Sequence, residues 1–324
     1  MTNLYQMDEN NGIKYEEALG LVKAELEHTL SRSPIIIREY TKHLLTSQGK
    51  FIRAISVITA AEDKEGRVHP DAIRLAASIE LIHLASLVHD DIIDNADLRR
   101  GNVTLQKKYG KRTAVICGDY LLSVALNMAA SCKNKQEYLE LELHDYVGKV
   151  CLGELNQHIN NHNLNLSIYQ YFKIISGKTA ALFEASFLAG AITSGVRGTE
   201  LNRYRQLGFE IGMIFQLTDD CMDFENTRAE AEKPVQSDYE QGVITLPLIH
   251  ALSELADFKE KAEKTGVSRQ EINAAVTKAD GLPFTRRIVK KYYNKAVKLM
   301  DTLDISEAKK EKLAFILKKA SRLV

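Results

Sequence analysis

The chain has few helix-breaking residues, and none of its five prolines lies between Pro70 and Pro234. That interval is filled by apolar residues at helical spacing. Because proline is poorly tolerated inside a helix, its absence here favours long helices over strands and turns. The sequence shows no strand-like alternation, no low-complexity segment and no shift in composition that would mark a linker. It therefore predicts one all-α domain over residues 1–324.

Paired cysteines and an excess of charge of one sign are also missing. The four cysteines, Cys117, Cys132, Cys151 and Cys221, form no Cys-x-x-Cys pair and no metal-ligand spacing. We therefore expect reduced core thiols in a cytosolic protein. The 43 basic side chains balance 43 acidic ones, so the overall charge favours neither a nucleic acid nor an anionic membrane as a partner. Any phosphate binding must come from local clusters.

Long apolar runs are absent as well. No uncharged apolar stretch reaches about 18 residues, and the nearest approach, residues 180–196, contains Glu184. The N-terminus has no basic region followed by an apolar run, so no signal peptide is expected. With 45% hydrophobic residues the chain can still bury a sizeable core. We expect a soluble, cytoplasmic protein without a transmembrane segment.

Capping residues mark several helix starts. Ser33-Pro34, Pro70 and the Ser268-x-x-Glu271 capping box each precede a periodic apolar segment. The expected helices run from Pro34 to near Gly49, from Pro70 towards Asp94, over residues 113–131, 136–160, 167–192 and 199–224, from about Thr245, from Ser268, and through two basic amphipathic segments near the C-terminus.

The same acidic pattern occurs twice, at residues 90–94 (Asp-Asp-Ile-Ile-Asp) and 219–223 (Asp-Asp-Cys-Met-Asp). Each copy continues an apolar helical segment. At 3.6 residues per turn, the first and last Asp of each copy lie one turn apart on the same helix face. Carboxylates so placed can bind Mg²⁺, which accepts few protein carboxylates and completes its shell with water and phosphate oxygens. Two such faces would hold a diphosphate between metal ions.

A solvated acidic surface is the alternative interpretation of each copy. At the usual abundance of Asp, one Asp-Asp-x-x-Asp arises by chance in about 7% of chains of this length. Two independent copies are far rarer, and an exposed face would not normally continue a stretch such as Leu84-Ala85-Ser86-Leu87-Val88. The pair of clusters therefore favours metal binding.

Cationic and amide side chains accompany the two clusters. The adjacent arginines of Leu98-Arg99-Arg100-Gly101 can offer planar donor pairs to phosphate, or can be solvated loop residues. Gly49-Lys50-Phe51-Ile52-Arg53 is similar to an anion site at a helix start, although a solvated surface is the more frequent meaning of such a pattern.

Four more polar residues lie at suggestive positions. His83 is two turns before Asp90, and Gln216 is one turn before Asp219. Lys178, before Thr179, either extends its stem along apolar surface or places a cation in a pocket. Lys233 follows the second cluster in a loop. Each signal is weak alone, and together they describe an acidic cavity with cationic rims.

These residues match a known pattern. Residues 80–101, ELIHLASLVHDDIIDNADLRRG, resemble the first aspartate-rich region of the trans-isoprenyl (polyprenyl) diphosphate synthases, and residues 215–224, FQLTDDCMDF, resemble the second. The resemblance extends from about Leu44 to Pro247. It is strongest to medium- and long-chain enzymes, including catalytic subunits of heterodimeric hexaprenyl and heptaprenyl synthases. It implies antiparallel helices around a central deep pocket and a homodimer, or a heterodimer with a small subunit.

The resemblance also implies a role for each site residue. Isopentenyl diphosphate would be joined to an allylic diphosphate such as farnesyl diphosphate, with about two to three Mg²⁺ ions as cofactors. Asp90, Asp94 and Asp219 would bind Mg²⁺ directly, supported by Asp91, Asp220 and Asp223. Arg99, Lys178 and Lys233 would bind the allylic diphosphate, whereas Lys50, Arg53, His83 and Arg100 would bind isopentenyl diphosphate. Gln216 and Thr179 would face the carbocation.

Three segments depart from the family pattern. The usual Gly-Gly-Lys-Arg-x-Arg-Pro reads Gln48-Gly-Lys-Phe-Ile-Arg-Ala54, which keeps the lysine and the second arginine. Gly-Lys-Pro-x-Gly after the second cluster reads Glu232-Lys-Pro-Val-Gln236, and the later Gly-Lys-x-Thr reads Gly242-Val-Ile-Thr245. The first region is intact, so we expect activity, with closure and rate affected by the altered loop.

Product length depends on the residue five positions before the first aspartate, where a bulky aromatic stops growth early in this family. Here it is Ala85, followed by Ser86, which predicts a pocket that extends deeper along the helix. Each further turn of the helix opens about 5.4 Å, so a product longer than about 20 carbons is expected. The resemblance to the hexaprenyl and heptaprenyl enzymes implies a length of about 30 to 40 carbons at about one five-carbon unit per turn. The alternatives are a short-chain farnesyl or geranylgeranyl diphosphate synthase and a non-catalytic subunit. A terpene cyclase would lack the second cluster.

Overall fold

The computed structural model describes residues 12–45, 49–99, 101–132, 142–229 and 238–322. Arg100, Lys233 and the Glu232–Gln236 segment lie outside the described residues. Contacts within the chain group it into two compact units. Unit 1 consists of Met1–Val147, Leu182–Arg205 and Leu303–Ile316, and unit 2 of Gly148–Ala181, Gln206–Thr302 and Leu317–Val324. Each unit is described by itself, and the single domain over residues 1–324 stays a prediction.

Unit 1 is built almost wholly of helices. Its complete elements are β1 (Ile13–Lys14), α1 (Tyr15–Ser31), α2 (Ile35–Leu45), α3 (Ile52–Ala61), β2 (Arg67–Val68), α4 (Pro70–Ile93), β3 (Leu98–Arg99), β4 (Asn102–Val103), α5 (Leu105–Tyr109) and α6 (Lys111–Ala130). It also includes parts of α8 (Leu143–Ile159), α10 (Ala181–Thr193), α11 (Gly198–Ala229) and α16 (Glu307–Ser321).

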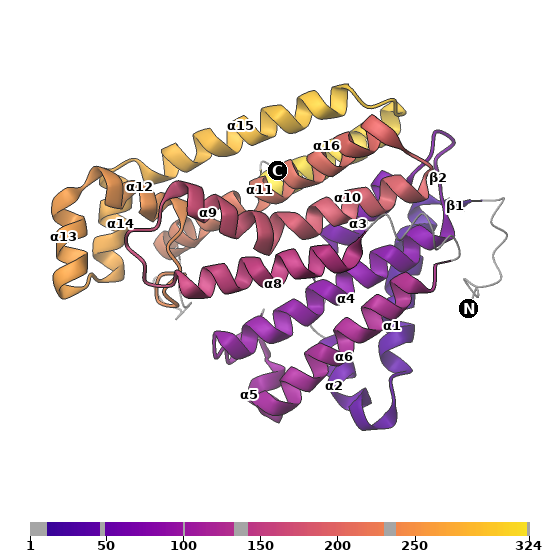
Figure 1. The fold of residues 1–324 in the computed structure, drawn as a ribbon, viewed down its shortest axis with the longest axis horizontal. Helices are drawn as coiled ribbons and strands as arrows, with labels where there is room; N and C mark the ends of the chain where they lie inside the picture. The colour runs from indigo at the N-terminus through magenta and orange to yellow at the C-terminus, as the bar shows by residue number, and fades with distance from the viewer. Residues whose placement is uncertain (1–11, 46–48, 100, 133–141, 230–237, 323–324) are drawn as a thin grey trace. The chain divides into compact units, whose positions relative to one another are not determined.

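Helix α4 is the core of unit 1. It packs against α1, α3 and α6, and its first half is buried on every side (Figure 1). A helix that is apolar all round is stable only when neighbours cover it. Its one buried cation is Arg74, whose Nη1 donates to Asp71 Oδ1 at 2.7 Å. Pro70 occupies the first turn, and the His69 ring accepts the Asp71 N–H, so the start of this helix is fixed by its own sequence.

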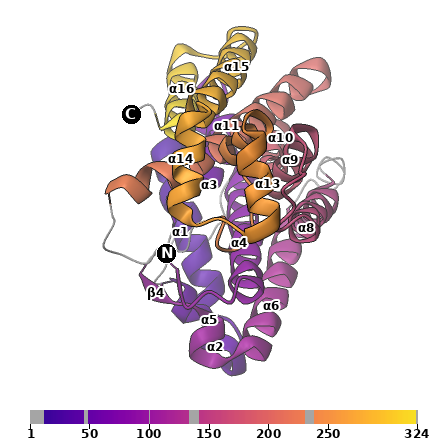
Figure 2. The same cartoon turned by 90° about the vertical axis from the view of Figure 1, so that its left-hand side faces the viewer.

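Strands are confined to two short antiparallel pairs in the described chain. β1 pairs with β2, and β3 pairs with β4 around the turn that follows the first aspartate cluster. Figure 2 shows β4 at the same end of unit 1 as α2 and α5. Strands of two residues show too little alternation to be recognised in the sequence, which explains why none was expected.

Unit 2 contains α9 (Ile168–Ile175), the π-helical turn η3 (Ser176–Ala180), α12 (Leu246–Glu254), α13 (Ala256–Thr265), α14 (Arg269–Lys278) and α15 (Gly281–Asp301), with most of α8 and α11. Helix α12 packs against α9, α13, α14 and α15. An apolar cluster that includes Leu217, Phe224 and Leu246 joins α11 and α12 in one core. The Ser268–Glu271 capping box is confirmed at the start of α14.

The predicted all-α class is confirmed, and several details differ from the prediction. The expected helix over 167–192 is divided by η3 into α9 and α10. Helices α1, α3, α5 and α13 had not been predicted. Helix α2 is described only to Leu45, so its expected end near Gly49 falls beside residues outside the description. The expectation of four core thiols is wrong at Cys151, which is exposed on α8, whereas Cys117, Cys132 and Cys221 are buried.

Two helices, α4 and α6, are long and apolar enough by length and composition to cross a membrane. The most apolar window of α4 is 67% buried in the protein, and that of α6 is 33% buried. In α4 this burial accounts for the apolar composition, because a core helix needs the same residues as a membrane span.

Candidate active site

The first aspartate cluster lies at the C-terminal end of α4 in unit 1. The Asp94 N–H donates to the Asp90 carbonyl at 2.8 Å, so the two residues are one helical turn apart, as predicted. Asp90 is half-buried and Asp94, the C-cap residue, is exposed. Asp91 is rotated towards the interior and is buried. The outer two carboxylates are therefore placed for ligands, and the middle one for structure.

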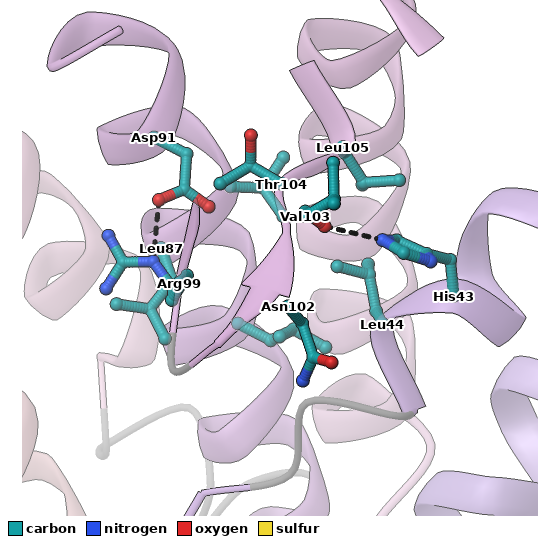
Figure 3. A pocket seen from close by; sticks show the side chains of 11 residues that line it. His43, Leu44, Leu87, Asp91, Arg99, Asn102, Val103, Thr104 and Leu105 are labelled. Atoms are coloured by element: carbon teal, nitrogen blue, oxygen red, sulfur yellow. Dashed lines mark hydrogen bonds and ion pairs between the residues drawn. The ribbon is translucent and has the colours of Figure 1, made fainter. Parts of the chain in front are cut away.

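Asp91 fixes the cationic hairpin that follows. The Arg99 Nε donates to Asp91 Oδ1 at 2.6 Å (Figure 3). Burial raises the pKa of Asp91, and the Arg99 guanidinium opposes that rise. The loop before the hairpin is held at the Ala96 carbonyl, which accepts from Thr104 Oγ1 and from Gln106 Nε2, both at 2.7 Å. The chain thus returns Arg99 to the end of α4.

A small cavity lies behind this hairpin. Asp91, Arg99 and Thr104 line it together with apolar side chains of α2, α4 and α5, and the His43 Nε2 lies 2.8 Å from the Val103 carbonyl oxygen (Figure 3). Its volume is about 30 Å³, which is room for about two water molecules. It is too small for a diphosphate.

The predicted cations of the Gly49–Ala54 segment lie at the start of α3, also in unit 1. Arg53 is 8% exposed, and its guanidinium carbon is 4.8 Å from the centroid of the Phe183 ring. Lys50 is exposed. The Ala54 N–H donates to Glu80 Oε1 of α4 at 2.9 Å, which ties this helix start to α4. The start of α3 is therefore held beside the middle of α4.

The departure at Phe51 has a structural consequence. Phe51 is the N-cap of α3 and has a left-handed backbone with φ of 50°. A non-glycine residue is strained in this region, and strain of this kind is concentrated at functional sites. The Lys23 ammonium lies 5.6 Å from the centroid of its ring. The family's turn is thus changed in sequence, while Lys50 directly precedes the N-cap and Arg53 lies in the first turn of α3.

The remaining predicted residues of unit 1 are on α4. His83 is half-buried, two turns before Asp90. The Ser86 Oγ donates to the His83 carbonyl at 2.8 Å, and Ala85 is buried. The helix therefore gives both small residues a fixed place close to the first cluster.

The second aspartate cluster lies on α11 in unit 2. Asp219 is exposed, Asp223 is half-buried and Asp220 is 1% exposed. Tyr171 Oη donates to Asp220 Oδ2, and Gln216 Nε2 donates to Asp220 Oδ1 at 2.8 Å. Burial raises the pKa of Asp220 to about 7, against the lowering effect of these two hydrogen bonds. As in the first cluster, the middle aspartate faces inward.

A fourth carboxylate, Asp238, belongs to this cluster. Its pKa is raised to about 8, first by burial and then by the charges of Asp220, Asp223 and Asp219, while Lys178 opposes the shift. The Asp238 backbone N–H bonds to the Asp223 carboxylate. Asp238 was not predicted, because it lies 15 residues beyond the cluster and outside its repeat.

The π-turn η3 presents Lys178 and Thr179. It forms where α8 and η3 touch at two glycines: a Cβ on Gly153 would lie 2.2 Å from the Lys178 nitrogen, and one on Gly177 would lie 2.8 Å from the Lys149 carbonyl oxygen. Such bulges occur often at functional sites. Two glycines thus allow the close contact that accompanies the bulge.

Lys178 and Thr179 of η3 each have a polar partner in unit 2. Lys178 Nζ lies 2.7 Å from Glu154 Oε2 of α8, and Thr179 Oγ1 donates to Gln216 Oε1 at 2.6 Å. The Gln216 amide is therefore oriented from both ends, because its nitrogen donates to Asp220. Glu154 was not predicted, although a partly buried lysine requires a partner.

The donor chemistry of both clusters suits Mg²⁺. Within the described ranges, no three carboxylate, histidine or thiol groups form a ready set of ligands. Mg²⁺ does not require one, because water and phosphate oxygens complete its shell. Burial is the main cause that raises the pKa of Asp223, Arg269 and the Asp238 backbone N–H oppose the rise, and the neighbouring charges of Asp219 and Glu240 add to it.

The structure thus assembles the predicted site as two sets. Unit 1 contains Lys50, Arg53, His83, Ala85, Ser86, Asp90, Asp91, Asp94 and Arg99, and unit 2 contains Lys178, Thr179, Gln216, Asp219, Asp220 and Asp223. Arg100 and Lys233 lie outside the described residues. The ligand-binding roles of these residues stay predictions.

Comparison with known proteins identifies the family. The family model described as polyprenyl synthetase matches residues 34–279. The chain belongs to the polyprenyl synthetase family. It is accordingly an enzyme that extends prenyl chains, and its all-α architecture is the isoprenoid synthase fold.

Individual relatives agree over most of their length. Heptaprenyl diphosphate synthase component 2 from Geobacillus stearothermophilus is 35% identical over 299 residues, covering 90% of this chain and 91% of the relative. The crystal structure of heptaprenyl diphosphate synthase from Staphylococcus aureus matches with a TM-score of 0.86 and 31% identity, over 97% of this chain and 100% of that one. A polyprenyl synthase from Caulobacter crescentus, complexed with calcium and isoprenyl diphosphate, matches with a TM-score of 0.84 and 28% identity, over 95% of this chain and 96% of that one.

Proposed function

We propose that this protein is a polyprenyl diphosphate synthase that adds isopentenyl diphosphate head-to-tail to an allylic diphosphate such as farnesyl diphosphate. The observation that carries the proposal is the repeated arrangement of carboxylates on α4 and α11. In each, the outer aspartates are one turn apart and more exposed, and the middle one is buried. Two such clusters suit a metal-bridged diphosphate, the leaving group of this reaction.

The cofactor that we propose is Mg²⁺, about two to three ions, held by Asp90, Asp94 and Asp219 with Asp223 in support. When bound, these ions stabilise the negative charge that develops on the departing diphosphate. Arg99, Lys178 and Lys233 bind the allylic diphosphate and share in that stabilisation. Lys50, Arg53, His83 and Arg100 hold isopentenyl diphosphate so that its double bond meets the allylic carbon.

The polar groups of η3 and α11 suit the allylic cation. Thr179 Oγ1 and the Gln216 amide oxygen carry partial negative charge, and their hydrogen bond at 2.6 Å fixes both. Such preorganised dipoles stabilise a cation without reorganisation. No side-chain nucleophile is needed in this scheme. The allylic C–O bond breaks, the double bond of isopentenyl diphosphate supplies the electrons of the new C–C bond, and the departing pyrophosphate accepts the proton that is lost.

The product that we propose is all-trans and longer than about 20 carbons, since Ala85 and Ser86 leave room along α4 at about 5.4 Å per turn. The matching heptaprenyl synthases support this length. A short-chain farnesyl or geranylgeranyl synthase is the alternative. A non-catalytic subunit is disfavoured, because all six aspartates of the two clusters are present.

A partner subunit is part of the proposal, either a second copy or a small unlike subunit. In unit 1, α6 exposes Val115, Ile116 and Leu126, and an exposed apolar helix face is typical of a protein interface. The relative named component 2 also suggests a heteromeric assembly. We propose a cytoplasmic location for the assembly. Light scattering of the purified chain measures its oligomeric state, and Ile116→Asp is expected to shift it towards the monomer.

The deciding experiment incubates the purified chain with farnesyl diphosphate, labelled isopentenyl diphosphate and Mg²⁺ and sizes the product. A labelled product longer than about 20 carbons is expected. Asp90→Ala and Asp219→Ala should each lower turnover by several orders of magnitude with little change in Tm, because neither carboxylate is buried. Near-normal turnover of either variant with Mg²⁺ present would refute the two-cluster mechanism.

A further inference from the structure

A buried phenol that no motif marks holds the second aspartate cluster. The Tyr171 hydroxyl donates to Asp220 Oδ2, and Gln216 Nε2 donates to the other carboxylate oxygen at 2.8 Å. Tyr171 is 3% exposed and Asp220 is 1% exposed. Both oxygens of Asp220 are therefore engaged inside unit 2, and this carboxylate is placed to orient α11.

Tyr171 is itself held in one position. It lies in the first turn of α9, which the Ser167–Gln170 capping box closes, and its N–H donates to the Ser167 carbonyl at 2.9 Å. Its ring contacts Phe172 with centroids 5.6 Å apart. It also belongs to the apolar cluster that includes Leu217 of α11. The hydroxyl therefore meets Asp220 at a point fixed by both helices.

We propose that Tyr171 is a positioning residue for the carboxylates of α11, and this inference rests on the proposed function. A buried carboxylate needs donors, and the phenol supplies one of the two that Asp220 has in unit 2. Without the hydroxyl, Asp220 turns towards another donor. Asp219 and Asp223 are one and three residues away on the same helix, so the turn that carries them moves as well.

The hydrogen-bond network of Asp220 includes Gln216 and Thr179, the two residues that the proposed function places at the reacting carbon. Gln216 donates to Asp220 and accepts from Thr179 at 2.6 Å, so the amide orientation depends on a fixed Asp220. Loss of the Tyr171 hydroxyl should therefore affect both metal binding and the Gln216 amide. Residues that orient ligands in this way typically alter metal affinity by about 10- to 100-fold when they are replaced.

The test uses the full-length chain with Tyr171→Phe, which removes one oxygen atom. Asp90→Ala and Asp94→Ala are included in every protein so that the first cluster no longer binds metal. Mn²⁺ binding is measured by electron paramagnetic resonance with inorganic pyrophosphate present. The expected result is about tenfold or greater weakening of Mn²⁺ binding.

Tyr146→Phe is the matched control. Tyr146 is also buried and donates its hydroxyl to a carboxylate, Glu184 Oε1, at 2.8 Å, but this pair lies in unit 1. It should lower Tm by a similar amount and leave Mn²⁺ affinity within about twofold, as expected for two sites that do not share partners. Equal weakening by both variants, or wild-type affinity in Tyr171→Phe, would overturn the proposal.

Asp220→Asn gives an independent second variant should Tyr171→Phe fold poorly. It removes the anchored carboxylate, so it should weaken Mn²⁺ binding on its own and make an added Tyr171→Phe change nearly silent. If the loss of Mn²⁺ binding free energy in the double variant equals the sum of the losses in the two single variants, Tyr171 does not act through Asp220. Product formation is measured separately in the chain with an intact first cluster. If this chain forms product but the Tyr171 and Asp220 variants leave Mn²⁺ affinity unchanged, only this inference is refuted. If the variants weaken Mn²⁺ binding as expected but the chain forms no product, only the proposed function is refuted.

Discussion

The Arg322 guanidinium contacts the Asp219 carboxylate, with Nη2 2.6 Å from Oδ1. Arg322 follows α16 near the C-terminus, and Asp219 is the exposed first residue of the second cluster. Both belong to unit 2. The guanidinium thus takes one of the oxygens that the proposed function gives to Mg²⁺. Under the proposed function, a metal ion and Arg322 compete for the same carboxylate.

We predict that Arg322→Ala tightens Mn²⁺ binding in the absence of substrate by about two- to fivefold, the range expected when a partly exposed ion pair is removed. Calorimetric titration of the full chain measures the change. Arg286→Ala is the control, because it removes an ion pair with Glu225 on the same helix without touching Asp219. Unchanged or weaker binding in Arg322→Ala contradicts the competition.

The two substrates should respond to different cations. Arg53→Ala is expected to raise the KM for isopentenyl diphosphate about 10- to 100-fold, the loss typical of one charge-assisted hydrogen bond, with a much smaller effect on the allylic substrate. Lys178→Ala and Lys233→Ala should each raise the KM for the allylic diphosphate, with a much smaller effect on the KM for isopentenyl diphosphate. A lowered kcat in place of a raised KM would mean that the contact strengthens only as the bond breaks.

Steady-state kinetics with each substrate varied in turn measures this separation. Arg53 is buried against Phe183, so Tm is followed in parallel, and Arg53→Lys provides a variant that keeps the charge. The assignment is wrong if Arg53→Ala and Lys178→Ala each raise the KM for isopentenyl diphosphate and the KM for the allylic diphosphate equally.

Stability at alkaline pH should depend on Lys309. Its Nζ is buried and donates to the carbonyls of Ala60 and Glu62 at 2.8 and 2.6 Å, and it lies 5.1 Å from the Tyr204 ring centroid. Burial lowers the pKa of Lys309 from 10.5 to about 8, although Glu62, Glu200 and Asp63 oppose the shift. Between about pH 8 and pH 10.5, Lys309 is therefore protonated in the unfolded chain and deprotonated in the folded chain. The free energy of unfolding therefore rises with pH from about 8 to 10.5, by at most about 3 kcal/mol from this group.

Urea unfolding between pH 7 and 10 measures this contribution as the difference between the wild type and Lys309→Met. The difference should be constant below pH 8 and should grow above it. Lys64→Met is the control, since Lys64 is an exposed residue that pairs with Asp304 in the same unit. Parallel pH profiles of wild type and Lys309→Met would contradict the prediction.

Local patterns allowed the all-α class, several of the helices and the two clusters to be predicted from the sequence. Pro70 and the Ser268 capping box fix helix starts through contacts within a few residues, so their effect is visible in the chain itself. The spacing of Asp90 and Asp94 was likewise enough to place both on one face, which the Asp94–Asp90 hydrogen bond confirms. The spacing did not show that the middle aspartates are buried, because their burial depends on neighbouring elements, and only the family resemblance gave Asp91 and Asp220 a supporting role.

The partners of the site could not be predicted, because each comes from a distant part of the chain. Tyr171 lies 49 residues from Asp220, Glu154 lies 24 residues from Lys178, and Arg322 lies 103 residues from Asp219. The π-turn was missed for the same reason. It depends on a contact between Gly153 and Gly177, and neither glycine has a local signal for it. Helix periodicity does not show which faces meet.

Product length provides a test of the residues on α4. Ala85 is buried and the adjacent Ser86 is half-buried, with its hydroxyl bonded to the His83 carbonyl. Larger side chains lie one turn earlier, at Leu81 and Ile82, which are both buried. If Ala85 borders the hydrocarbon pocket, a bulky residue there should stop growth about three to four turns of helix early, at about 5.4 Å per turn.

We predict that Ala85→Tyr shortens the product from about 30 to 40 carbons to about 15 to 20, a loss of several five-carbon units at about one unit per helical turn. Condensation itself should continue, because the aspartates and cations are unchanged. Reverse-phase chromatography of the labelled product after dephosphorylation measures its length.

Since Ala85 is buried, a tyrosine can also disturb packing, which typically costs about 1–3 kcal/mol. Ser86→Tyr, at the less buried neighbouring position, gives a second reading, and Tm is recorded for both variants. A folded, active Ala85→Tyr chain with an unchanged product would show that Ala85 packs only against neighbouring helices, and a wild-type product of farnesyl diphosphate would favour the short-chain alternative.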